Sequence, residues 1–371
     1  MAMRKIKLAV LFGGRSGEHE VSLMSARSIM NALDPNKYEL YPVGITREGR
    51  WLAGGDPMKA LEEKNESGCF RAQIVLDPEQ PGLLLMENDW KKPTPVKEFI
   101  ELDLVFPVLH GPFGEDGTVQ GLLELAGLPY VGSGVLGSAV GMDKVIMKQL
   151  FEKWGLPVAP YLFFNLWQWR KGKEEMLRKI LSSLGLPLFV KPANLGSSVG
   201  ISKVKKEEDL GTAIELAFSY DLKVIVEAFV AGKEIECSVL GNEELQVSLP
   251  GEIIPCNEFY DYRAKYIDGH SQLVIPAPIP GHLVSRVQEL SIAAFQAVGA
   301  EGLARVDFFV NESQNKVVLN EINTMPGFTS ISMYPKLWEA TGIGYSELLD
   351  RIIQLALERH RARKKLKTTF Y

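Results

Sequence analysis

Two pairs of polar residues in the last quarter of the chain have the types and the spacing of a magnesium site. Arg305 and Asp307 share one face of an expected strand, because side chains alternate along a strand. Glu321 and Asn323 share one face of the next strand in the same way. Two carboxylates and an amide oxygen suit Mg²⁺ that bridges phosphate groups, although a solvated hairpin has the same pattern. The apolar opposite faces and the turn at 325–327 that follows favour a site.

A lysine followed by a loop of small residues is a second candidate. Lys191 ends an expected strand and precedes a loop rich in Gly and Ser that extends to Lys203. Such a loop lets backbone N–H groups approach phosphate oxygens, and the lysine adds a positive charge. The loop lacks the Gly-Lys-Ser/Thr sequence of a P-loop. From these residues alone, a phosphate site and a flexible hairpin both remain open.

Two further glycine-rich loops follow expected strands. Residues 13–22 contain Glu18 and Glu20, and residues 110–117 begin with His110. Open α/β sheets bind ligands at the carboxyl ends of their strands, where backbone N–H groups point outward. The alternatives are acidic residues that merely favour the first turn of a helix and a histidine with a structural role. The glycine spacing does not match a dinucleotide-binding loop.

One segment mixes aromatic and charged residues without a clear period. It runs from Phe259 to Tyr266, and Asp268-Gly269 after it predicts a turn. The segment is interpreted either as an edge strand or as a lid, over about 258–272, that carries Lys265 to the site.

Strands and helices must position these loops, and the hydrophobic pattern predicts both. Residues 5–12, 38–45 and 102–109 are expected to form buried strands of a parallel sheet with crossover helices. Residues 47–96 are rich in Gly, Pro and Glu and are interpreted as an irregular peripheral insertion. Downstream we expect helices at 139–150, 168–184, 207–219, 284–298 and from 345, and strands at 186–191, 223–230, 234–240, 245–249, 304–310 and 316–322.

Length and composition fit a globular protein of several domains. The 371 residues are 46% hydrophobic and 23% charged, and roughly 150 residues per domain predicts more than two domains. We expect domains at 1–132, 133–231 and 232–371. A net charge of -5 provides no general field for nucleic acid, so we expect none as the main partner. The basic residues 361–367 are interpreted as a helix C-terminus with a solvated tail.

Cysteines and apolar runs predict a cytoplasmic location. Cys69, Cys237 and Cys256 are an odd number at no metal-ligand spacing, which fits a reducing compartment. The apolar runs are far shorter than the roughly 18 residues of a membrane span, and no signal peptide is recognised. We therefore expect no membrane partner.

Taken in order, eight segments resemble the ATP-grasp family and, within it, the D-alanine:D-alanine ligases. They are GGRSGEHEVS, HGPFGEDGTVQG, VGSGVLGSAVGMDK, KPANLGSSVGISK, EAFVAGKEIECSV, EFYDYRAKY, ARVDFF and NEINTMPGFTSISMYP. The resemblance covers essentially the whole chain. It implies an α/β fold of three-domain ATP-grasp architecture, in which an N-terminal parallel α/β sheet precedes two α+β domains that clamp the nucleotide. The central domain then holds the phosphate loop, and the C-terminal domain holds the metal site and the lid.

The resemblance also implies a reaction. The γ-phosphate of ATP is attached to the carboxylate of one D-alanine, and the amine of a second D-alanine attacks the acyl phosphate, as a step of peptidoglycan synthesis. Phosphorylation turns a carboxylate oxygen into a good leaving group, and Mg²⁺ and cations offset the charge of two anions that meet. The resemblance implies two Mg²⁺ or Mn²⁺ ions and a homodimer.

Residue roles follow from the resemblance by position. Nucleotide contacts are implied for Lys144, Lys191, Ser197, Ser198, Val199, Glu227, Ala228, Val230, Glu234, Lys265 and Asn323. Metal ligands are implied at Asp307, Glu321 and Asn323. Substrate-binding or catalytic roles are implied for Glu18, His110, Ser197, Lys265, Tyr266, Arg305, Gly327 and Ser332.

Within that set the resemblance gives each group a task. Glu18 receives the ammonium of the first D-alanine, and Arg305 and the N–H of Gly327 face the oxyanion. Ser332 and Lys265 contact the second carboxylate and the transferring phosphate. The remaining implied contact is a hydrogen-bonded trio of Glu18, Ser197 and Tyr266.

Three functions stay in competition. A ligase that makes D-alanyl-D-alanine leads, and Tyr266 favours an amine acceptor, because the ester-forming ligases resemble this pattern with a different residue there. A D-alanine:D-lactate ligase, or another ATP-grasp carboxylate-amine ligase, comes second. A catalytically inactive nucleotide-binding protein comes third, and the intact Arg305, Asp307 and Glu321 argue against it.

Overall fold

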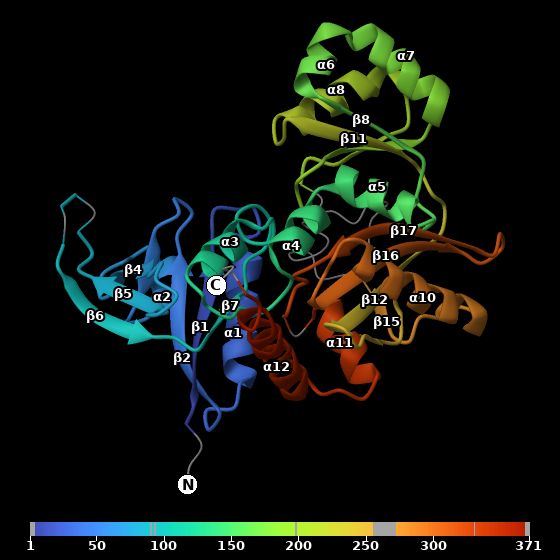
Figure 1. Ribbon diagram of the computed structural model, residues 1–371. Helices are drawn as coiled ribbons and strands as arrows, with labels where there is room; N and C mark the ends of the chain where they lie inside the picture. Colours follow the sequence, from blue (N-terminus) through green and yellow to red (C-terminus); the bar gives the residue numbers. More distant parts are fainter. Residues whose placement is uncertain are drawn as a thin grey trace.

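Three β-sheets with their helices make up the part of the chain that the structure describes. This computed structural model describes residues 4–89, 91–92, 94–196, 199–254, 272–329 and 331–367. Two of the sheets lie next to each other in a broad base, and the third stands above them (Figure 1).

The first sheet is formed by the N-terminal part of the chain, in the order β6-β5-β4-β3-β2-β1-β7. Strand β1 pairs in parallel with β2 and β7, which confirms the parallel sheet predicted from the sequence. The strands are β1 Ile6–Gly13, β2 Tyr38–Ile45, β3 Trp51–Ala53, β4 Phe70–Ile74, β5 Gly82–Met86, β6 Val96–Glu101 and β7 Leu104–Pro107. The helices of this region are α1 His19–Ala32, α2 Pro57–Glu62 and α3 Thr118–Leu125.

The prediction that residues 47–96 are irregular is wrong. They contain β3, α2, β4 and β5, and the antiparallel strands β3 to β6 extend the first sheet. Leu83 and Leu85 alternate into the core from β5, and the carboxylate of Asp56 caps α2 by accepting from the N–H of Lys59. Strands of three to five residues separated by glycine and proline turns are too short for a clear period in the sequence.

The second sheet stands apart at the top of Figure 1, in the order β10-β9-β11-β8. We call this sheet and its helices, residues 161–228, the upper lobe. Its own hydrophobic core includes Phe164, Trp169 and Val190. The strands are β8 Tyr161–Asn165, β9 Leu188–Pro192, β10 Ser202–Val204 and β11 Lys223–Ala228, and the helices are α6 Leu166–Lys171, α7 Lys173–Leu184 and α8 Glu207–Phe218.

The third sheet has the order β15-β14-β12-β16-β17, with β13 paired to β12. Helix α10 packs on it, and Leu290 and Phe295 share its core with Ile235 and Phe308. The strands are β12 Lys233–Gly241, β13 Gln246–Val247, β14 Gly251–Ile254, β15 Gln272–Val274, β16 Gly302–Asn311 and β17 Lys316–Asn323, and the helices are α10 Gly281–Ala297, α11 Met333–Ala340 and α12 Tyr345–Lys364.

Two helices that the sequence predicts as continuous are each divided. The expected helix 139–150 is split into α4 Val135–Met142 and α5 Lys144–Lys153, because the carboxylate of Asp143 accepts from the N–H groups of Val145 and Ile146 and starts a new helix. The expected helix 168–184 is split into α6 and α7 at Gly172. Capping side chains and glycine end a helix locally without changing its apolar period.

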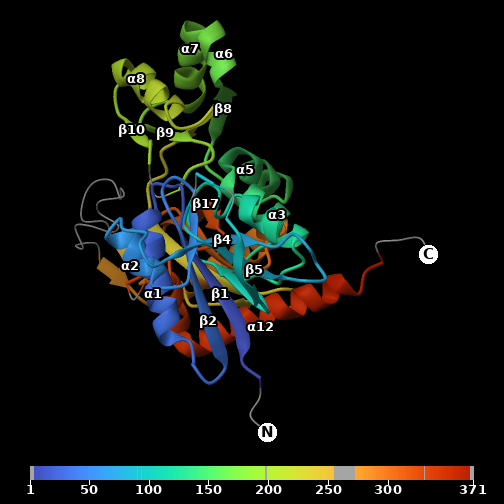
Figure 2. The ribbon, with the colours of Figure 1, turned by 90° about the vertical axis from the view of Figure 1, so that its left-hand side faces the viewer.

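The first and third sheets share one hydrophobic core, and we call them with their helices the base. Residues from β1, such as Val10 and Phe12, belong to the same cluster as Leu349 and Ile353 of α12. Helix α12 lies between the two sheets in Figure 1 and crosses the base in Figure 2. Helix α12, the last helix described, thereby packs in the same core as β1, the first strand.

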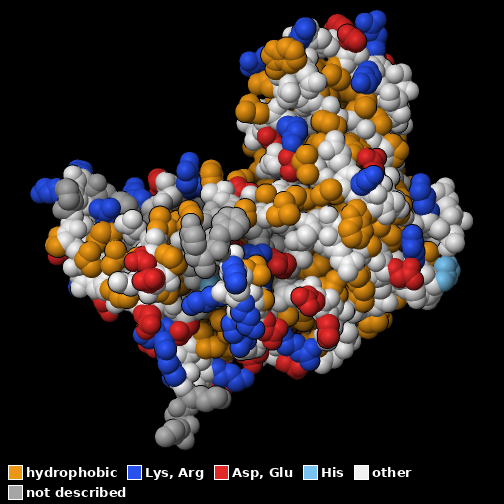
Figure 3. Space-filling view, viewed as in Figure 1, with side chains coloured by type: hydrophobic (Ala, Val, Ile, Leu, Met, Phe, Trp, Pro, Cys, Tyr) orange, Lys and Arg blue, Asp and Glu red, His pale blue; other side chains and the backbone are white. Residues whose placement is uncertain are grey.

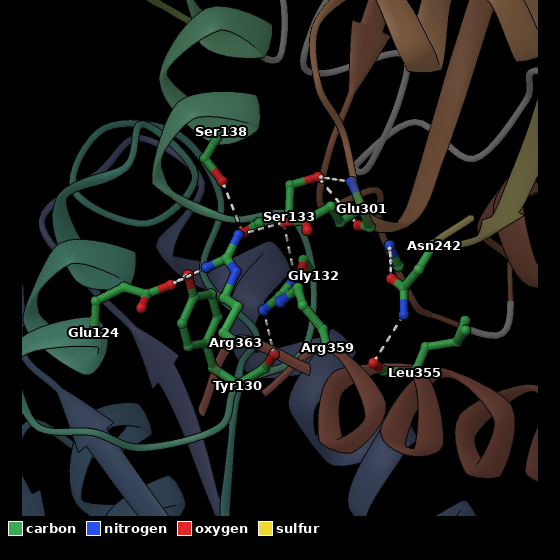
Figure 4. Close-up of polar contacts among 11 residues, drawn as sticks. Glu124, Tyr130, Gly132, Ser133, Ser138, Asn242, Glu301, Leu355, Arg359 and Arg363 are labelled. Atoms are coloured by element: carbon green, nitrogen blue, oxygen red, sulfur yellow. Dashed lines mark hydrogen bonds and ion pairs between the residues drawn. The ribbon is translucent and has the colours of Figure 1, made fainter. Parts of the chain in front are cut away.

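Polar contacts reinforce this junction (Figure 4). The guanidinium of Arg359 on α12 is buried and donates to the carbonyls of Gly132 and Tyr130. Ser133 Oγ donates to the carbonyl of Glu301 and accepts from its N–H. Arg363 forms ion pairs with Glu124 and Glu301, so α12 holds both the segment after the first sheet and the start of β16.

The face shown in Figure 3 carries acidic and basic side chains side by side, with a group of Lys and Arg near the centre. The last turn of α12 supplies Arg361, Arg363 and Lys364, which confirms that the basic end includes a helix C-terminus, where cations are favourable. Within the described ranges, no helix has the length and apolarity needed to cross a membrane.

Candidate active site

A cavity of about 100 Å³ opens where the base meets the upper lobe. The first sheet contributes the loop after β1 and the loop after β7, and the third sheet contributes β16, β17 and the segment before α11. Its lining residues are Glu18, His110, Glu115, Gly196, Glu236, Ile253, Leu273, Arg305, Glu321, Asn323, Met325, Pro326, Gly327, Ile331, Ser332 and Met333. The cavity thus collects seven of the predicted site residues from distant parts of the sequence: Glu18, His110, Arg305, Glu321, Asn323, Gly327 and Ser332.

The pairs on β16 and β17 come together as the strand pattern predicts. Arg305 lies opposite Asn323, and Asp307 lies opposite Glu321. Arg305 forms a bidentate pair with Asp307, with Nε–Oδ1 and Nη2–Oδ2 distances of 2.7 Å. Asn323 Nδ2 donates to Asp307 Oδ2 at 3.0 Å, and Arg305 Nε lies 2.9 Å from Glu236 Oε2. The arginine is therefore held rigidly, with its charge at the cavity.

The chemistry of this donor set fits a divalent cation. Asp307 and Glu321 face each other across the ladder and Asn323 adds an amide oxygen, all hard oxygen ligands. Lys144 Nζ lies 3.7 Å from Glu321 Oε2, and Arg305 neutralises Asp307. Among the described residues, no group of three His, Cys, Asp or Glu side chains forms a metal-binding cluster, so the amide is needed to complete this set.

Two loops close tightly around Glu18. Its side chain is buried, and a Cβ at Gly111 or at Gly196 would lie 2.9 Å from Glu18 Oε2. Gly111 also has φ +75°, which favours glycine. These glycines let the loop after β7 and the loop after β9 approach one carboxylate, which is placed to receive a cationic group.

His110 and Glu115 come from the same loop after β7. His110 Nδ1 lies 3.1 Å from the carbonyl oxygen of Met325, and burial lowers the pKa of the imidazole. Glu115 Oε1 accepts from the N–H of Gly111 at 2.9 Å. Loss of hydration and the nearby Glu18 charge raise the pKa of Glu115 to about 8.

Sequence reasoning missed Glu115 as a site residue. It stands five positions after His110 in the loop already marked by its glycines, which is the signal that could have identified it.

Gly327 and Ser332 form the wall near α11. A Cβ at Gly327 would lie 2.8 Å from Ser332 Oγ, so only a glycine leaves the serine in place. Ser332 Oγ accepts from the N–H of Thr329 at 3.0 Å. These contacts fix the conformation of the loop after β17, which lines the same cavity as Arg305.

A second cavity, of about 440 Å³, lies between the upper lobe and the third sheet. It contains the predicted nucleotide residues Lys144, Lys191, Glu227, Ala228, Val230 and Glu234. Gly196, Glu236, Ile253 and Glu321 line both cavities, so the two are adjacent and share a wall.

Charges in the second cavity are paired. Lys191 Nζ donates to Glu227 Oε2 at 2.7 Å, and Lys148 Nζ lies 3.3 Å from Glu227 Oε1. Burial alone would raise the pKa of Glu227, but the two lysines outweigh it and lower the pKa to about 2. Lys144 Nζ donates to the carbonyl of Leu195 at 2.6 Å, which ties α5 to the start of the Gly/Ser loop.

Several predicted residues are not placed in either cavity. Ser197, Ser198, Lys265 and Tyr266 lie outside the described residues, as does nearly all of the predicted lid at 258–272. Val199 is described, and its N–H donates to the carbonyl of Gly196 at 3.2 Å, beside the shared wall of the two cavities.

Models of known protein families match both the N-terminal and the C-terminal part of the chain. The family described as D-ala D-ala ligase N-terminus matches residues 7–133, and D-ala D-ala ligase C-terminus matches residues 150–354. The chain belongs to the D-alanine–D-alanine ligase family. It is 53% identical to the D-alanine–D-alanine ligase of Natranaerobius thermophilus and 51% identical to that of Heliobacterium modesticaldum. These alignments cover 99% and 98%, respectively, of both chains.

Solved structures of related ligases have a fold similar to that of this chain. The D-alanine-D-alanine ligase from Coxiella burnetii has a TM-score of 0.83 at 39% identity and covers 98% of this chain and 97% of its own. The VanG D-Ala:D-Ser ligase from Enterococcus faecalis has a TM-score of 0.83 at 38% identity and covers 95% of this chain and 100% of its own. The predicted α/β fold class and family are confirmed.

Proposed function

We propose that this protein joins two D-alanine molecules into D-alanyl-D-alanine with ATP, through a D-alanyl phosphate, and releases ADP and phosphate. The observation that carries the proposal is that the two cavities are adjacent and share lining residues. One contains acidic groups suited to an ammonium and an arginine suited to an oxyanion, and the other contains lysines suited to phosphates. Glu321 lies on their shared wall, where a phosphoryl group would pass.

The D-alanine half of the site orients two substrates. We assign Glu18 to the ammonium of the first D-alanine, with His110 beside it. Arg305 and the N–H of Gly327 stabilise the negative charge that develops on the attacked carbonyl oxygen. Ser332 lies where it can contact the second carboxylate, and Lys265 and Tyr266 keep the roles implied by the sequence.

The nucleotide half aligns ATP. Lys144 and Lys191 supply positive charge to the phosphates, and residues 197–199 keep the phosphate-covering role implied by the sequence. Glu227, Ala228 and Val230 hold the adenine and Glu234 the ribose. Asp307, Glu321 and Asn323 would hold Mg²⁺ or Mn²⁺, which offsets charge on the transferring phosphoryl group when bound.

Purified protein with ATP, Mg²⁺ and D-alanine tests the proposal. Phosphate release and D-alanyl-D-alanine should appear together and should both require D-alanine. D-serine and D-lactate, offered as second acceptors, distinguish the alternatives, since a solved relative is named a D-Ala:D-Ser ligase. Phosphate release without a ligated product would contradict a ligase, and preferential use of D-lactate would replace it by the ester-forming alternative.

Finer features of the proposal come from the family resemblance. We infer two metal ions, a homodimer and a cytoplasmic location. Titration of Mn²⁺ in the presence of ADP and a phosphate mimic measures the ion count, and sedimentation equilibrium measures the oligomer. One bound ion, or a monomer at micromolar concentration, would correct the corresponding inference.

A further inference from the structure

A buried lysine that the sequence pattern does not mark stands behind the nucleotide cavity. Lys148 on α5 is 1% exposed. Its ammonium lies 3.3 Å from Glu227 Oε1 and donates to the carbonyl of Asn320 at 3.1 Å. Glu227 belongs to β11 of the upper lobe, and Asn320 precedes Glu321 on β17. One cation therefore connects the upper lobe to the strand that carries the predicted metal ligands.

The two lysines on Glu227 differ in what else they can reach. Lys191 lines the nucleotide cavity, where a phosphate could draw its ammonium away from Glu227. Lys148 is not part of that lining, and its contact with Asn320 holds it in place. When Lys191 turns to a phosphate, Lys148 is the cation that stays with Glu227.

We propose that Lys148 is a positioning residue that keeps the Glu227 carboxylate neutralised and so frees Lys191 to bind nucleotide phosphates. The inference rests on the proposed nucleotide site. A buried carboxylate that loses its cations is strongly destabilised. Without Lys148, Lys191 becomes the counter-ion that Glu227 retains, and the phosphates lose their lysine.

Lys148→Met tests this, because methionine keeps an unbranched apolar side chain and removes the charge. Calorimetry should show ATP affinity reduced by about tenfold or more, as expected for a lost hydrogen bond to a charged group. The affinity for adenosine, which has no phosphate, should fall by no more than about twofold. A change of that size is within the range expected when the mutated site and the ligand contact are independent. The KM for D-alanine should stay within the same range. Lys153→Met is the control, since Lys153 is an exposed lysine on the same helix.

A change that merely loosened the cavity would weaken adenosine and ATP equally, and that result would overturn the inference. Unchanged ATP affinity would overturn it as well. A second comparison applies even if Lys148→Met is unstable. In a Glu227→Gln background there is no carboxylate to neutralise, so adding Lys148→Met should change ATP affinity by less than about threefold if the two residues act together. A tenfold loss in that background would contradict the coupling.

The variant Lys191→Met shows whether a negative result concerns Lys148 or the proposed nucleotide site itself. If Lys191→Met leaves ATP affinity unchanged, the proposed phosphate contact is wrong. If Lys191→Met weakens ATP binding and Lys148→Met does not, the site holds and only the role of Lys148 is wrong.

Discussion

The two junctions of this molecule are built differently. Within the base, the first and third sheets share a large hydrophobic core, closed by α12 and by the buried guanidinium of Arg359. The upper lobe has a separate hydrophobic core, which is formed by residues of this lobe alone. The start of α5 joins it to the base through a small cluster of Val145, Ala193 and Ile225 and through several polar contacts.

Those polar contacts are concentrated in a short stretch of helix. Lys144 donates its backbone N–H to the carbonyl of Ala193 at 3.0 Å and its ammonium to Leu195. Asp143 pairs with Lys223, and Lys148 pairs with Glu227. Polar contacts can exchange partners when a charged ligand arrives, whereas a continuous apolar core repacks only at high cost. We therefore expect a rigid D-alanine half and an adjustable nucleotide half.

The largest effect is expected where the two halves meet. Glu321→Gln should lower turnover by about 1,000-fold or more with the fold intact, because a lost carboxylate charge weakens a cation that must bridge phosphate oxygens. Product formation at ordinary Mg²⁺ measures this, with the exposed Glu243→Gln as the control. A turnover near that of the wild type would remove Glu321 from the metal site.

A substitution at Arg305 tests whether the rigid D-alanine half stabilises the transition state of the reaction. Arg305→Ala should lower kcat by about 100-fold, the usual loss for one oxyanion-stabilising donor, with a smaller change in ATP affinity. Single-turnover kinetics and calorimetry with ATP separate the two effects. If ATP binding collapsed while the chemical step survived, Arg305 would belong to the nucleotide half.

Arg359 tests the rigidity of the base itself. Arg359→Met removes the donor of two buried carbonyls and should lower the free energy of unfolding by about 2 kcal/mol. Arg351→Met is the matched control on the same helix, since Arg351 forms an exposed pair with Glu347, and about 0.5 kcal/mol is expected for it. Urea unfolding measures both. Equal losses would show that the junction at Arg359 adds nothing to the apolar core.

The same contrast explains how far the sequence could predict the structure. The strand pairs around Arg305 and Glu321 and the order of the motifs were accessible, because strand alternation and turns are local signals. The strands within 47–96 were not, because their short runs gain stability from a neighbouring sheet rather than from their own pattern. Lys148 was missed because a buried lysine on a helix looks like any solvated one until its partners are known. The domain boundaries after 132 and 231 stay predictions.

Glu115 gives the smallest expected effect and tests the acidic pair in the rigid half. Its pKa of about 8 in the folded protein lies above the ordinary value of 4.5. Between these values the folded state keeps a proton that the unfolded state has lost, so stability falls as the pH rises through this window.

Glu115→Gln cannot ionise and should lack this loss. From urea unfolding at pH 6 and pH 8, we expect the wild type to lose on the order of 1 kcal/mol more than the variant. The exposed Glu244→Gln, which leaves Glu115 in place, should follow the wild type. Parallel losses in wild type and Glu115→Gln would mean that Glu115 is already ionised at pH 6, and that Glu18 and Glu115 can both be charged before any ammonium binds between them.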